Sequence, residues 1–118
     1  MNKEDKELLL KDLCARLPYG VKIQVPYEDG SGYFDEIVWE VNNDGPFHVN
    51  GWGIEYEYVK PYLFPLSSIT KKTLEELSAY IDIKNAYVAV EFFNSHHIDY
   101  RGLIEKGLAI DATGKNIY

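Results

Sequence analysis

The chain lacks several features that assign a protein to a class directly. It has 118 residues and a single cysteine, Cys14, so neither an internal disulfide nor a cysteine-based zinc finger can form. No apolar run approaches the roughly 20 residues needed to span a bilayer. The charged start, Met-Asn-Lys-Glu-Asp-Lys-Glu, is unlike a secretory signal peptide. These absences predict a cytoplasmic protein without a membrane segment.

Motifs for catalysis are also missing. Ser67 and Ser95 have no G-x-S-x-G context, and no glycine-rich turn leads into the Lys-Ser or Lys-Thr helix start of a phosphate loop. Carboxylate pairs such as Glu36 with Glu40 need a cleft to act as a glycosidase, and a small sheet is poorly supplied with one. We therefore predict no catalytic residue and no cofactor.

Basic residues are absent from residues 28–59. This block holds eight carboxylates and no Lys or Arg, whereas the rest of the chain has 11 acidic and 12 basic residues, so the block accounts for the net charge of −7. Nucleic acids and anionic membranes need a positive surface, so we predict no direct contact with either. The block predicts a docking face for a basic protein; the alternative is that it keeps an exposed sheet soluble.

Aromatic residues accompany the acids in this block. Trp52 lies between two glycines, which present the indole either outward as an interface anchor or inward as a core residue. Carboxylates would steer the partner and aromatic rings would supply contact area. The predicted partner-binding residues are Glu36, Glu40, Glu55, Glu57, Trp52, Tyr56 and Tyr58.

Hydrophobic spacing predicts an α+β fold in a single domain, residues 1–118, that begins with a helix. Leu9, Leu13 and Leu17 recur every four residues, and Cys14 widens this apolar stripe as a small core residue. Asn2 is the expected N-cap, and the Pro-Tyr-Gly that follows stops the helix. The predicted helix spans Lys3 to Leu17.

An antiparallel β-meander of about four strands is expected next, because short turns separate the apolar-alternating runs. It would form a small curled sheet or a partly open barrel. Pro26 cannot donate a ladder hydrogen bond, which places the first strand at an edge or its end at a bulge. The predicted strands cover residues 21–28, 33–41, 47–49 and 54–59.

The C-terminal half is predicted to contain helices that pack on one face of this sheet. Residues 60–68, with two prolines, read as a rigid apolar connector. The pattern over residues 82–97 fits a helix or a strand, and we favour a helix because a strand would place Phe92 and Phe93 on opposite faces. The other predicted elements are a helix over 71–81, a short helix over 103–106, a strand over 108–110 and a mobile tail after Asp111.

The segment from Asn94 to Arg101 concentrates polar chemistry. Its candidate site residues are His96, His97, Asp99, Tyr100 and Arg101. Two adjacent histidines on a helix point about 100° apart, so they rarely bind one ion together.

Two interpretations of this segment stay open. His97 and Asp99 could share a metal if the backbone turns there, with His48 as a third ligand. Alternatively, the histidines end a helix, Asp99 caps a turn or pairs with Arg101, and Tyr100 packs.

Three stretches carry a family resemblance: residues 8–21, 60–68 and 96–109. Together they resemble a group of small uncharacterised proteins of gut Bacteroides-type bacteria and of their prophages or mobile elements. The resemblance spans most of the chain, and the last stretch is the most distinctive. It implies a bacterial cytoplasm and a phage or mobile-element accessory role, and it carries no catalytic residue.

The sequence therefore favours a small non-enzymatic interaction module whose acidic aromatic sheet binds a basic protein partner. Mimicry of the charge of DNA is a specific form of this hypothesis. One alternative is a small metal-dependent enzyme or metal-binding protein centred on His96, His97 and Asp99. Another is a structural or assembly protein, and the sequence does not set the oligomeric state.

Overall fold

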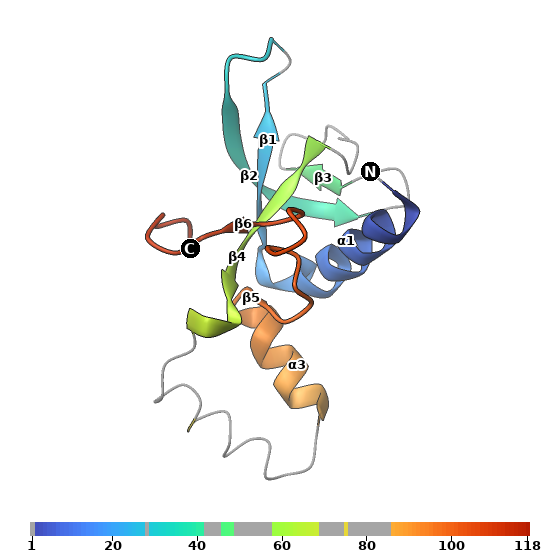
Figure 1. Ribbon diagram of the computed structural model, residues 1–118, viewed down its shortest axis with the longest axis vertical. Helices are drawn as coiled ribbons and strands as arrows, with labels where there is room; N and C mark the ends of the chain where they lie inside the picture. The colour runs from blue at the N-terminus through green and yellow to red at the C-terminus, as the bar shows by residue number, and fades with distance from the viewer. Residues whose placement is uncertain (1, 28, 42–45, 49–57, 69–74, 76–85) are drawn as a thin grey trace.

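The fold, taken from a computed structural model, is α+β (Figure 1). The structure describes residues 2–27, 29–41, 46–48, 58–68, 75 and 86–118. None of the helices in these ranges is long and apolar enough to cross a membrane. Its helices and strands are α1 (Lys3–Arg16), β1 (Lys22–Pro26), β2 (Tyr33–Val41), β3 (Pro46–His48), β4 (Lys60–Pro65), α3 (Ala86–Ser95), β5 (Ile98–Asp99) and β6 (Ile110–Asp111), with 3-10 turns at Leu17–Tyr19 and Leu66–Ser68.

Helix α1 confirms the N-terminal helix predicted from the sequence. The Asn2 side chain caps it by accepting a hydrogen bond from the Asp5 amide at 2.7 Å. The prediction that Cys14 is a core residue is wrong, because Cys14 is exposed. The buried stripe instead runs along the side that carries Leu9, Asp12, Leu13 and Arg16.

The sheet is mixed and open, which corrects the predicted antiparallel meander. Its strands follow the order β3-β2-β1-β4-β5, and β6 also pairs with β4. The pairs β1–β2 and β2–β3 are antiparallel, as predicted, and the pair β1–β4, which was not predicted, is antiparallel too. Strands β5 and β6 both pair with β4 in parallel, and these contacts join segments far apart in the sequence.

Strand β1 lies inside the sheet, although Pro26 predicted an edge or a bulge. Val21, Ile23 and Val25 are fully buried, as the alternation predicts. Pro26 is the last residue of the strand, and β4 pairs only with Ile23 and Gln24. Pro26 therefore lies beyond the first residue of β4, so its missing amide proton costs no hydrogen bond to that strand.

The predicted connector over 60–68 is a strand followed by a 3-10 turn. Tyr62 and Leu63 are buried between neighbours on both sides, because β1 pairs with the start of β4 and β6 with its middle. Of the predicted strand over 54–59, only Tyr58 and Val59 are described, and neither is in a strand.

The helical interpretation of residues 82–97 is confirmed for Ala86–Ser95, which form α3. The predicted helix over 71–81 lies outside the described residues except for Glu75. Residues 103–106 form turns rather than the predicted short helix, and β6 begins at Ile110, the last residue of the predicted strand.

Part of the tail after Asp111, which was predicted to be mobile, packs against the sheet, whereas residues 113–116 are exposed. Ala112 is only 1% exposed, and its amide donates to the Leu63 carbonyl at 2.8 Å.

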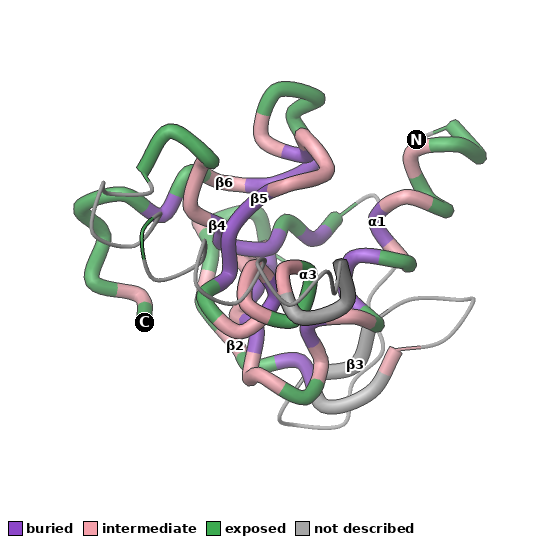
Figure 2. The backbone as a smooth tube through the Cα atoms, turned by 90° about the horizontal axis from the view of Figure 1, so that it is seen from below, coloured by how far each residue is buried: buried purple, intermediate pink, exposed green. Residues whose placement is uncertain are grey.

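The hydrophobic core joins α1, the sheet and the C-terminal turns. Buried stretches of α1, β2, β4 and β5 meet in the middle of the molecule, whereas the first turn of α1 is largely exposed (Figure 2). Among the described residues, the apolar side chains without solvent exposure are those of Leu9, Leu13, Val21, Ile23, Val25, Leu63 and Leu103.

Candidate functional site

One face of β2 exposes part of the acidic block to solvent. Alternation along the strand exposes Tyr33, Asp35 and Ile37, with Tyr33 64% and Ile37 40% exposed. Glu36 points to the opposite side of the sheet, where Val38 enters the core, and it is half-buried. An exposed carboxylate thus lies between an exposed aromatic ring and an exposed aliphatic chain.

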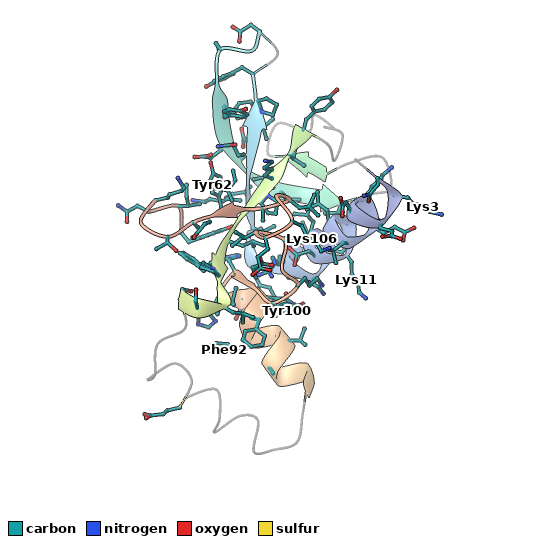
Figure 3. All side chains as sticks on the ribbon, in the orientation of Figure 1. Lys3, Lys11, Tyr62, Phe92, Tyr100 and Lys106 are labelled. Atoms are coloured by element: carbon teal, nitrogen blue, oxygen red, sulfur yellow. The ribbon has the colours of Figure 1, made fainter. Side chains whose placement is uncertain are left out.

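Asp35 is held in place by Tyr62 of β4, which is labelled in Figure 3. The Tyr62 hydroxyl donates to Asp35 Oδ1 at 2.5 Å and accepts from Gln24 Nε2 at 3.2 Å. Burial, together with the bond to Asp35, raises the pKa of Tyr62 to about 12. The hydroxyl therefore stays protonated at neutral pH and keeps donating to Asp35.

Aromatic residues also gather near the turn of the β1–β2 hairpin. The rings of Tyr27 and Phe34 lie 5.1 Å apart, and Tyr27 is 48% exposed. The turn between Tyr27 and Phe34 carries the acidic residue Asp29. The Asp29 carboxylate accepts a hydrogen bond from the Ser31 amide at 2.9 Å. The hydrogen bond of the Ser31 side chain, and then this amide bond, lower the pKa of Asp29, so the carboxylate stays charged in mild acid.

The predicted partner-binding residues are only partly described. Tyr58 is 57% exposed and precedes β4, and Glu40 lies opposite Phe47 in the β2–β3 pair. Alternation in the sequence places Tyr33, Asp35 and Ile37 on one face, but it does not say which face is exposed. The other predicted residues lie outside the described part of the chain: Trp52, Glu55, Tyr56 and Glu57.

The two histidines of the polar segment have different surroundings. His96 is exposed, stacks on Phe92 at 4.2 Å and lies 2.9 Å from the Phe92 carbonyl through Nδ1. His97 follows α3 with a left-handed backbone, φ 56°, and is buried. Its ring stacks on Tyr118 at 3.8 Å, and its carbonyl accepts from the Phe64 amide.

Burial lowers the pKa of His97 to about 4, and the charges of Arg16, His96 and Lys22 add to the shift. His97 is therefore neutral at physiological pH. Its Nδ1 has no hydrogen-bond partner among the described residues.

Asp99 and Arg101 do not pair with each other, although that pairing was one expectation. Both carboxylate oxygens of Asp99 accept amide hydrogens, from Leu103 at 2.9 Å and from Ile104 at 2.8 Å. Asp99 thus caps the turn, which was the other expectation. Arg101 reaches away to Asp12 on α1, where its Nη1 lies 2.8 Å from Oδ1.

A buried ionic cluster, which sequence reasoning missed, joins α1 to the end of α3. Asp12 and Arg16 are both fully buried, and Arg16 Nε donates to Asp12 Oδ2 at 2.9 Å. Arg16 also donates to the carbonyls of Phe93 at 3.3 Å and Ile98 at 2.6 Å. The spacing of Asp12 and Arg16, four residues apart beside Leu13, was the only signal in the sequence.

Tyr100 lies against this cluster, near the end of α3 (Figure 3). Its ring stacks on Phe93 at 5.5 Å, with the guanidinium of Arg101 4.5 Å and that of Arg16 5.5 Å from the ring centre. Tyr100 therefore packs, as one of the two interpretations expects.

Tyr118 is a second residue that sequence reasoning missed. Its hydroxyl accepts from the Lys22 amide at 2.8 Å and donates to the Tyr62 carbonyl at 2.9 Å. It thereby bridges β1 and β4 while its ring covers His97. No sequence pattern pointed to this role.

The described side chains do not assemble a metal site. No group of three or more His, Cys, Asp or Glu side chains that could hold a metal is found in the described ranges. His97 and Asp99 face different partners, and the side chain of His48 is not among those described. The polar segment, so far as it is described, holds the fold together.

Comparison with known proteins adds no relative. No protein-family model, no curated protein and no solved structure matches this chain.

Proposed function

We propose that the protein is a non-enzymatic interaction module whose acidic, aromatic sheet binds a basic protein partner. Glu36, Glu40, Glu55 and Glu57 steer the partner, and Trp52, Tyr56 and Tyr58 supply contact area. The observation that carries the proposal is the run of eight carboxylates without a Lys or Arg over residues 28–59, whose described part exposes aromatic side chains beside the acids.

Electrostatics supports this proposal over a purely solubilising role. Eight like charges in one segment repel one another, and this cost is offset when a cationic surface approaches. Exposed aromatic side chains do not improve solubility, whereas Tyr and Trp are enriched in the buried core of protein interfaces. Tyr27, Tyr33 and Tyr58 are each about half exposed or more.

The family resemblance suggests the setting. A bacterial cytoplasm and a phage or mobile-element accessory role would bring the protein close to host proteins that bind nucleic acid. Such proteins carry basic surfaces, so an acidic module that mimics the charge of DNA would compete with nucleic acid for them.

A capture experiment tests the proposal. The wild-type chain and a Glu36, Glu40, Glu55, Glu57→Gln variant are immobilised and exposed to a lysate of a gut Bacteroides-type bacterium. We expect basic proteins to be retained by the wild type and lost with the variant. They should be released as salt rises from 50 to 500 mM, because this rise shortens the Debye length roughly three-fold.

A matched control keeps the same change of net charge at sites outside the block. Glu4, Glu7, Glu75 and Glu105 are exposed, so their replacement by Gln removes four charges without touching the core. This control should retain the partner. Equal loss in both variants, or capture that ignores salt, would contradict a local docking face.

A further inference from the structure

The lower-numbered half of β2 forms an edge of the sheet. Strand β1 pairs with residues 33–37 of β2 on one side. On the other side β3 pairs only with Val38, Glu40 and Val41, and the register shifts between Val38 and Glu40. No strand among the described residues covers residues 33–37 on that side, and in Figure 1 this part of β2 runs along the outside of the projecting hairpin.

The backbone groups at this edge point outward at alternate residues. Tyr27 donates its amide to Gly32, and Val38 donates to Val21, so the even-numbered residues of β2 face β1. By the same alternation, the amide and carbonyl groups of Tyr33, Asp35 and Ile37 point away from β1. They offer an extended peptide a ladder of donors and acceptors.

The same three residues also present their side chains to solvent. Tyr33 and Ile37 are among the exposed large hydrophobic residues, and Asp35 is exposed between them. The hydrogen bond from Tyr62 fixes the Asp35 carboxylate through Oδ1. In a strand added at the edge, the side chain opposite Asp35 would lie beside this oriented charge.

We propose that an extended segment of a basic partner adds to the β2 edge as a further strand, with an Arg or Lys side chain on Asp35. Main-chain hydrogen bonds to Tyr33, Asp35 and Ile37 hold the segment. The Tyr33 ring and the Ile37 side chain cover the stem of the bound cation. This inference rests on the proposed function and adds to it the place and the mode of binding.

Charge selects this occupant over a second copy of the chain. Residues 27–41 contain five carboxylates and no Lys or Arg. Pairing two such edges would bring like charges opposite each other, which destabilises a strand pair. A segment in which every second residue is Arg or Lys carries the opposite charge, and its cationic side chains lie on the same face as Asp35.

Synthetic peptides supply a defined probe. We expect a fluorescent nonapeptide of alternating arginine and threonine to bind the wild-type chain in a polarisation assay, and the glutamate–threonine counterpart not to bind. A third peptide has the arginine sequence but carries N-methyl groups on alternate amides, so its charge is unchanged and its strand pairing is blocked. Binding should weaken at least about 10-fold, since the ladder hydrogen bonds are lost.

Amide chemical shifts locate the binding site. In a titration of the isotope-labelled chain with the arginine peptide, the largest changes should fall at Tyr33, Asp35 and Ile37. Changes confined to other residues of the acidic block would overturn the edge site while leaving the proposed function in place. Equal affinity for the N-methylated peptide would overturn strand addition.

Two single substitutions separate the local charge from the total charge. Asp35→Asn should weaken binding about 10-fold, as expected for loss of one close charge pair. Asp29→Asn is the matched control, because it removes one exposed charge from the hairpin turn while an Asn oxygen can still accept from Ser31. Equal effects of the two substitutions would overturn the role of Asp35.

The capture experiment judges the proposed function independently. If the four-Glu variant loses its partner while Asp35→Asn captures it normally, the acidic module stands and the edge site is wrong. If Asp35→Asn loses the partner and Asp29→Asn keeps it, the edge site is supported. If no variant alters capture, both proposals are wrong.

Discussion

At the scale of single residues, loss of the Arg16 side chain should strongly lower the free energy of unfolding. It is fully buried and makes bonds to Asp12, Phe93 and Ile98. Arg16→Met leaves the buried Asp12 carboxylate with Arg101 alone and two carbonyls without their donor. We expect the free energy of unfolding, measured in urea, to fall by about 3 kcal/mol or more.

The control for this substitution is an exposed ion pair on the same helix. Lys3 Nζ lies 4.0 Å from Glu7, and both side chains are largely exposed. Lys3→Met should change the free energy of unfolding by no more than about 0.5 kcal/mol. Similar effects of the two substitutions would contradict a buried cluster at Arg16.

His97 should make stability depend on pH in mild acid. Its pKa is lowered to about 4 in the folded chain from the ordinary 6.5, chiefly by burial. The unfolded chain therefore binds more protons between these values. The contribution of His97 to the free energy of unfolding is present above pH 6.5 and is lost as the pH drops toward 4. Between pH 7 and 4.5 the expected loss of unfolding free energy from this group is about 2 kcal/mol.

Two variants isolate this contribution of His97. His97→Phe keeps a ring against Tyr118 and removes the titrating group, so the loss between pH 7 and 4.5 should shrink by most of that amount. His96→Asn alters the exposed neighbour and should leave most of the pH dependence in place. An unchanged pH dependence in His97→Phe would show that other groups cause it.

At the scale of elements, the turn after β5 depends on Asp99. Its two oxygens accept from the amides of Leu103 and Ile104 and thus act as a cap. Asp99→Ala should lower the free energy of unfolding by about 2 kcal/mol, and Asp99→Asn, which keeps one acceptor oxygen, by roughly half as much. Thermal unfolding of the three chains measures both.

Zinc in the same melting experiment tests the metal interpretation of this segment. We expect the melting temperature of the wild-type chain to be the same with and without excess zinc. A rise in the wild type that disappears in Asp99→Ala would favour the metal-binding alternative, because a ligand that binds only the folded state must stabilise it.

Elements set by local patterns could be predicted from the sequence, whereas those set by distant partners could not. The four-residue repeat and Asn2 predicted α1, and alternation predicted β1 and β2. Strand β4 was taken for a connector, because its parallel partners lie more than 30 residues further along the chain. Prolines at 61 and 65 strengthened the wrong prediction, since Pro is disfavoured inside sheets.

The candidate site divides in the same way. The acidic block could be predicted from composition, and the shared face of Tyr33, Asp35 and Ile37 from the alternation of β2, but not which face is exposed. The anchor of Asp35 could not, because Tyr62 lies 27 residues away and reaches it across β1. Pairing of Arg101 with its neighbour Asp99 was one of two expectations, whereas its partner Asp12 is 89 residues distant.

At the scale of the whole molecule, Tyr118 ties the end of the described chain to its centre. Its hydroxyl joins the Lys22 amide to the Tyr62 carbonyl, and its ring covers His97. Burial raises the pKa of this hydroxyl to about 12, so the bridge is intact at neutral pH. Three segments far apart in the sequence thus meet at one side chain.

Removing this one hydroxyl tests how far the bridge holds β1 and β4 together. Tyr118→Phe keeps the stacked ring but leaves the Lys22 amide and the Tyr62 carbonyl without their partner, so the free energy of unfolding should fall by about 1–2 kcal/mol. The Lys22 amide should exchange its hydrogen at least about 10-fold faster, because a lost bond of this size raises local opening by that factor. Tyr33→Phe removes a hydroxyl from an exposed ring and should alter neither quantity. If Lys22 exchanged at its wild-type rate in Tyr118→Phe, the bridge would contribute nothing, and stacking on His97 alone would hold the C-terminal segment on the sheet.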